Sequence, residues 1–220
     1  MNFFGHALTA QRSEAARGAV RAEFVLGAML PDFASMLRTR PPGASQDALR
    51  AGLAFHHATD DAFHGAQSFV EFSREASSFL LGRGLPRGSA RAVAHVGVEL
   101  VLDGAFALLE SAANEAYLSA IDCALTERVA STIHWPSLDA GVRFERLCLT
   151  LKTRGAFPSH TPAELLAERL RAILAGRPRL AMDEAGQSVV REWLVTARPA
   201  IVSGAAQLLS EVEQRLALKG

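Results

Sequence analysis

The chain is poor in cysteine, with only Cys123 and Cys148 among its 220 residues. Two cysteines this far apart are too few for a disulfide framework or a thiolate zinc site, so we expect both to be reduced, buried thiols. The sequence also lacks an excess of charge of either sign, because 23 Lys and Arg residues balance 23 Asp and Glu residues. No global field favours nucleic acid or an anionic membrane, and we expect neither as a partner.

Signals for secretion or membrane insertion are missing as well. The N-terminal segment, MNFFGHALTAQRSEAARG, has neither a basic start nor a long apolar run, so it does not resemble a secretory signal. The most apolar later stretch, residues 96–109, is interrupted by Glu99 and Asp103. This interruption argues against a membrane span of about 20 apolar residues, and we expect a cytoplasmic protein.

Alternation of β-branched residues is almost absent, so the sequence predicts no strands. Apolar residues instead recur at three- and four-residue spacing, which is the helical period. With 49% hydrophobic and 21% charged residues, the chain can bury a real core. No repeat, low-complexity tract or long linker divides it. We therefore predict an all-α fold, a single-domain multi-helix bundle that covers residues 1–220.

Proline and glycine clusters separate the expected helices, as at Pro41, Pro42 and Gly43 and in the glycine-rich segment 82–88. The expected helices cover residues 3–10, 19–30, 46–64, 67–81, 89–112, 115–131, 137–152, 162–175, 183–197 and 199–218.

The segment GLAFHHATDDAFHG carries the first group of candidate ligands, His56, Asp60 and His64. Their i, i+4, i+8 spacing drifts by only about 80° around a helix axis, so they share one face. An imidazole and a carboxylate one turn apart can converge on one cation. His57 and Asp61 repeat the spacing one residue later, and only one of the two pairs can point inward. A solvated helix face is the alternative interpretation.

A second triplet has the same spacing in an otherwise apolar helix, where His95, Glu99 and Asp103 follow one another. The apolar context predicts a largely buried helix, and buried carboxylates are costly unless a cation compensates them. No Arg or Lys occurs between Arg91 and Arg128. A metal ion shared with the His56 face would supply the missing charge.

Two upstream residues, His6 and Asp32, are weaker candidates when each is taken alone. A single His on an apolar face is more often a hydrogen-bonded core residue. Asp32 directly follows Pro31 at the expected end of a helix, where an Asp is more often a turn residue or a cap.

Four segments, taken in order, resemble the motifs of one known family. The start MNFFGH resembles the family's MNFLAH and aligns His6 with its early histidine. The segment GAMLPDF resembles GNLLADF and puts Asp32 at the family's aspartate. The segment GLAFHHATD resembles GIxxHxxID through His56 and Asp60.

The fourth match is a D-x-x-x-D pair on an apolar helix, to which Glu99 and Asp103 correspond. The chain thus resembles the acyl carrier protein phosphodiesterase family, a distant branch of the HD-type metal-dependent phosphohydrolases. It departs from the family pattern where Phe63 and His64 replace a Thr-Asp dipeptide, and where no basic residue follows Asp32 and its phenylalanine. The match ends with the first half of the chain.

The resemblance implies an HD-phosphohydrolase-like fold and a metal-dependent phosphoesterase whose site comes from roughly the first 110 residues. A divalent ion, either manganese, iron, zinc or magnesium, would be the cofactor. The substrate would be a phosphate ester, with the phosphopantetheine arm of acyl carrier protein as the candidate that the resemblance implies. The alternative is a non-catalytic metal-binding or interaction protein that retains the helical fold. A di-iron oxygenase is disfavoured because its Glu-x-x-His pairs are missing.

Asp32, His64 and Glu99 are the candidates for proton transfer, and the expected metal ligands are His6, Asp32, His56, Asp60, His64, Glu99 and Asp103.

Overall fold

The structure is a computed structural model that describes residues 1–154 and 161–218, and these residues are mostly helical. This confirms the all-α prediction. The helices are α1 Phe3–Ala15, α2 Ala22–Met36, α3 Asp47–His64, α4 Gln67–Gly82, α5 Arg87–Leu109, α6 Ser111–Ala124, α7 Glu127–Ala130, α8 Leu138–Arg154, α9 Ala163–Leu174 and α10 Glu184–Ala217, with a 3-10 turn at Pro178–Leu180.

Two short strands contradict the prediction that the chain has none. β1 (Gly43–Ala44) and β2 (Ile133–His134) form an antiparallel pair in which Gly43 lies opposite His134. They lie in the loops before α3 and before α8. Two residues are too few to leave a period-2 pattern in the sequence, so the pairing could not be detected there.

The chain divides into two compact units, each built from two separate segments, and each is described here by itself. Unit 1 comprises Met1–Asp61 and Phe106–Phe157, and unit 2 comprises Ala62–Ala105 and Pro158–Gly220. The single-domain organisation and the HD-like arrangement stay predictions.

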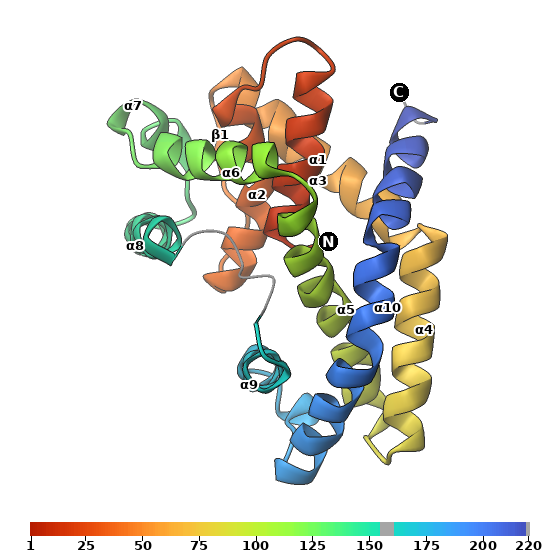
Figure 1. The fold of residues 1–220 in the computed structure, drawn as a ribbon. Coiled ribbons are helices and arrows are strands. Elements are labelled where there is room, and N and C mark those ends of the chain that lie inside the picture. Colours follow the sequence, from red (N-terminus) through yellow and green to blue (C-terminus); the bar gives the residue numbers. More distant parts are fainter. Residues whose placement is uncertain (155–160, 219–220) are drawn as a thin grey trace. The chain divides into compact units, whose positions relative to one another are not determined.

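In unit 1, α1 and α2 pack against each other and against α6, and α8 packs on α6 (Figure 1). Buried aromatic side chains fill the space between these helices. The ring of Phe3 lies 5.6 Å from that of Phe33 and 6.0 Å from that of Tyr117, between centroids. Aromatic pairs at this separation add to the hydrophobic stabilisation of the core.

The approach of α2 to α3 depends on two glycines. A Cβ atom built on Gly52 would lie 2.2 Å from the carbonyl oxygen of Phe24 and 2.8 Å from the Cα of Gly27. A Cβ atom on Gly27 would in turn lie 2.4 Å from the carbonyl oxygen of Leu49. Only glycine at both positions allows the two backbones to come this close.

In unit 2, α10 runs beside α4 and also packs on α9 (Figure 1). Trp193 of α10 is buried and covers Gly97 of α5, where an added Cβ would meet its ring at 2.6 Å. The sequence predicted two helices, 183–197 and 199–218, but α10 continues through Pro199. A proline removes one main-chain donor from a helix. The residue whose carbonyl loses this bond, Val195, is exposed to solvent.

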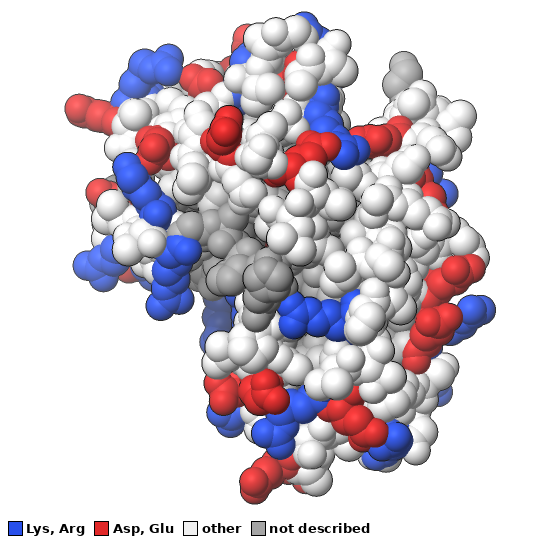
Figure 2. Space-filling view, viewed as in Figure 1, with Lys and Arg blue, Asp and Glu red and all other residues white. Residues whose placement is uncertain are grey.

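By length and composition α5 could cross a membrane, because its most apolar 18-residue window has a mean hydropathy of 1.7. However, 56% of that window is buried inside the protein. Burial of this kind is typical of a core helix of a soluble protein. On the face drawn in Figure 2, basic and acidic residues are interspersed, in keeping with the formal net charge of zero.

Candidate metal centre

Three of the expected ligands come together in unit 1, each from a different helix. His6 lies in α1, Asp32 in α2 and His56 in α3, and one ligand atom from each lies within 4.8 Å of the other two. His6 is fully buried, His56 is 7% exposed, and the side chain of Asp32 is 22% exposed. The group is therefore open to solvent mainly on the Asp32 side.

The close crossing of α2 and α3 places His56. The ring Nδ1 of His56 lies 2.8 Å from the main-chain carbonyl oxygen of Ala28, the residue after Gly27. Because a carbonyl only accepts hydrogen bonds, Nδ1 must carry the proton. In the neutral ring Nε2 then holds the lone pair that can bind a cation, which is the usual arrangement of a metal-binding histidine.

Thr59 holds the ring of His6 through a hydrogen bond to Nδ1. The Thr59 hydroxyl donates to the carbonyl oxygens of Phe55 at 2.9 Å and His56 at 2.8 Å. Its oxygen lies 2.9 Å from Nδ1 of His6. When the single hydroxyl proton is donated to one of the two carbonyls, the His6 ring donates to Thr59 through Nδ1. Its Nε2 then carries a lone pair.

This Nε2 is buried and has no hydrogen-bond partner among the described residues. It lies 3.8 Å from an oxygen of Asp32 and 3.7 Å from an oxygen of Asp60. A lone pair that faces two carboxylate oxygens is unfavourable unless a proton or a metal ion lies between them.

Burial lowers the pKa of His6 to about 3, and the nearby Asp60 carboxylate only partly opposes this effect. Burial also lowers the pKa of His56, against the opposing hydrogen bond to Ala28. Both imidazoles are therefore neutral near pH 7. Their rings stack with centroids 3.9 Å apart. Two neutral imidazoles and a carboxylate are a donor set that fits a divalent transition-metal ion.

Asp60 lies beside this group rather than in it. Its Oδ1 accepts a hydrogen bond from the N-terminal amine of Met1 at 3.0 Å. Its side chain is 38% exposed. His57 and Asp61, the alternative inward pair of α3, are both exposed. Of the two pairs that the sequence left open, the one with His56 therefore faces the interior.

Two further expected ligands, His64 and Glu99, belong to unit 2 and form a second group with His95. The Nε2 atoms of His64 and His95 each lie 3.3 Å from the same oxygen of Glu99. Burial raises the pKa of Glu99, but hydrogen bonds from the two histidines outweigh it and hold the pKa well below its usual range. Glu99 is therefore a carboxylate at neutral pH.

His95 was absent from the expected ligands. Its i, i+4 spacing to Glu99 was the signal that could have identified it. Asp103 lies one turn after Glu99 on α5 and is fully buried. Among the described residues, neither group of three includes Asp60 or Asp103. The roles of His64 and Glu99 in proton transfer, and of Asp103 as a ligand, stay predictions.

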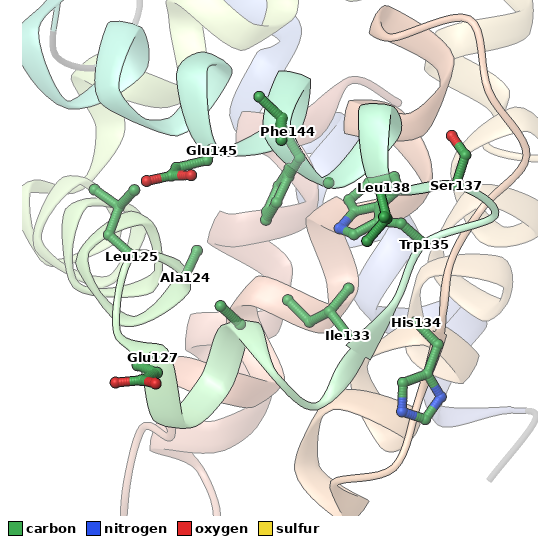
Figure 3. A pocket seen from close by; sticks show the side chains of 13 residues that line it. Ala124, Leu125, Glu127, Ile133, His134, Trp135, Ser137, Leu138, Phe144 and Glu145 are labelled. Atoms are coloured by element: carbon green, nitrogen blue, oxygen red, sulfur yellow. The ribbon is translucent and has the colours of Figure 1, made fainter.

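A separate pocket of about 710 Å³ lies in unit 1, between the end of α6 and the start of α8. Figure 3 shows Glu127 and Glu145 at one side of it and His134 and Trp135 at the other. None of the expected metal ligands lines it. Phe144, which lines the pocket, packs on Phe33 of α2 with ring centroids 6.0 Å apart.

The chain matches no model of a known protein family, no curated protein and no solved structure.

Proposed function

We propose that the chain is a divalent-metal-dependent phosphoester hydrolase whose metal centre is formed by His6, Asp32 and His56. The observation that carries this proposal is the buried Nε2 atom of His6, which has no hydrogen-bond partner among the described residues and faces the carboxylates of Asp32 and Asp60. A core histidine without a ligand would be expected to satisfy both nitrogens.

The donor set narrows the choice of ion. Imidazole nitrogens together with carboxylate oxygens suit manganese, iron or zinc better than magnesium, which prefers oxygen ligands only. A bound ion of this kind would polarise a phosphoryl oxygen and lower the pKa of a bound water.

The protein's own residues hold and orient the ligands. The Ala28 carbonyl fixes the Nδ1–H tautomer of His56, so that its Nε2 is available for binding, and Thr59 holds Nδ1 of His6 in place. Such outer contacts are as important to affinity as the ligands themselves. Asp60 lies next to His6 and is partly exposed, and it is the group that we assign to accept a proton from an attacking water.

The substrate class and the HD-like arrangement rest on the resemblance of His6, Asp32, His56 and Asp60 to the acyl carrier protein phosphodiesterase motifs. That resemblance favours a phosphodiester, with the phosphopantetheine arm of acyl carrier protein as the first candidate.

The test uses the full chain loaded with manganese. Hydrolysis of an aryl phosphodiester is followed by absorbance, and release of the arm from holo acyl carrier protein is followed by mass. We expect Asp32→Asn to abolish both metal binding and turnover, whereas a change at another exposed histidine, His134→Asn, leaves both unchanged. Turnover of the aryl ester alone would support the hydrolase function and refute holo acyl carrier protein as the substrate. Absence of both activities in metal-loaded protein refutes the hydrolase and favours a non-catalytic metal-binding protein.

A further inference from the structure

We propose that His64, His95 and Glu99 form a second metal site, open to solvent, for zinc or a similar first-row divalent ion. All three residues belong to unit 2. The proposal does not depend on the centre in unit 1 or on the hydrolase function.

The distances fit a metal ion. Each histidine Nε2 lies 3.3 Å from the same oxygen of Glu99, and the three ligand atoms are all within 4.8 Å of one another. Ligand atoms on a tetrahedron with zinc–ligand distances of about 2.0–2.1 Å are roughly 3.3 Å apart. The two distances from Glu99 to the histidines therefore match those between ligand atoms of one tetrahedral site.

Aromatic packing holds the two imidazoles in a common orientation. The rings of His64 and His95 are parallel, with an interplanar angle of 5° and centroids 5.0 Å apart. Phe69 presents its ring at right angles to both, at 5.2 Å from His64 and 5.5 Å from His95. Phe69 is itself buried against Phe63. Ligands that neighbouring side chains already orient lose less entropy when a metal binds.

The exposure of the three side chains differs in a way that suits an exchangeable ion. Glu99 is 15% exposed, whereas His64 is 33% and His95 is 48% exposed. The carboxylate thus forms the inner wall of the site, and the imidazoles border the solvent. An ion held by three protein ligands keeps at least one position for water.

The donor types select the class of ion. Two imidazoles with one carboxylate are found at zinc sites and at non-haem iron sites with open positions. Magnesium and calcium, which prefer oxygen ligands, fit poorly. The competing explanation is a metal-free network in which one or both histidines simply donate to Glu99.

Cobalt(II) and zinc titrations of the chelator-treated full chain distinguish these explanations. His95→Gln keeps an amide donor for Glu99 but removes the imidazole ligand. His57→Gln, at an exposed histidine of α3, is the matched control. Far-ultraviolet circular dichroism checks that each variant is folded.

We expect the wild type and His57→Gln to bind one more equivalent of zinc than His95→Gln. The zinc affinity of this site should be at least 10- to 100-fold lower in His95→Gln. Cobalt(II) should give a visible absorption band that is typical of low-coordinate geometry. In His95→Gln this band should lose the part of its intensity that comes from the site of His64, His95 and Glu99. Equal zinc stoichiometry in all three proteins, or no zinc binding by any of them, would overturn the proposal.

Discussion

Acidification of the metal-free protein should reveal the cost of keeping His6 buried and neutral. The pKa of His6 is about 3 in the folded protein, against 6.5 for an unperturbed histidine. The unfolded chain therefore takes up a proton near pH 6.5, which the folded chain does not. The contribution of His6 to stability is complete above about pH 6.5 and is lost as the pH falls towards 3.

The pKa of His6 differs by about 3.5 between the folded and unfolded chain, and one pKa unit corresponds to about 1.36 kcal/mol. The loss of unfolding free energy from this residue is therefore at most roughly 5 kcal/mol. At pH 5 the pH lies about 1.5 units below the pKa of His6 in the unfolded chain. The free energy of unfolding should therefore have fallen by roughly 2 kcal/mol from this residue alone.

The perturbation that isolates this effect is His6→Asn. The asparagine amide can still donate to Thr59, but no group remains that titrates. Urea unfolding of chelator-treated protein at pH 7.5 and at pH 5.0 gives the free energy of unfolding at each pH. His57→Asn, an exposed change, serves as the control.

Between these two pH values we expect the wild type and His57→Asn to lose roughly 2 kcal/mol more than His6→Asn does. Because His56 stacks on His6 with centroids 3.9 Å apart, this difference measures His6 together with its effect on His56. Equal losses in the wild type and His6→Asn would show that His6 is protonated or exposed in the folded state. That result would refute the buried, neutral His6 on which the metal centre depends.

Three other predictions concern stability. Gly52→Ala should cost about 1–3 kcal/mol by overpacking against Phe24, and metal affinity should fall with it, as denaturant unfolding and metal titration would show. Glu14→Gln should cost about 1 kcal/mol, because Glu14 is buried in a bidentate ion pair with the half-exposed Arg21. Arg21 lowers the pKa of Glu14 from 4.5, so this stabilisation is present above pH 4.5 and lost below it, and the variant should show a weaker loss in acid. Manganese at 100 times its Kd should raise the free energy of unfolding by about 2.7 kcal/mol, an increase that a chelator reverses and His6→Asn lacks.

The sequence predicted much of the unit 1 group, because its residues occur in ordered local motifs. His6, Asp32 and His56 come from three segments, and the structure brings them together. The helical period also predicted the all-α fold. Asp32 was expected after the end of a helix, yet α2 continues through Pro31 to Met36. Proline in the sequence favours a helix end, but packing of the flanking turns can keep a helix continuous.

The second group was harder to predict. His64 and Glu99 were expected at the same centre as His56. His56 and His64 share one face of α3, but the sequence cannot show that this helix passes from one compact unit to the other between them. His95 has the correct spacing to Glu99, but only tertiary packing against Phe69 reveals its orientation. The glycine contact between α2 and α3 was equally hidden, since a single sequence does not indicate which glycines face each other.

The most direct test of the metal centre is anomalous diffraction at the zinc edge from crystals of the zinc-loaded protein. We predict a peak at about 2.0–2.2 Å from Nε2 of His6, Nε2 of His56 and a carboxylate oxygen of Asp32. Bound zinc with no peak at these three residues, and with Nε2 of His6 hydrogen-bonded directly to a carboxylate, would contradict it.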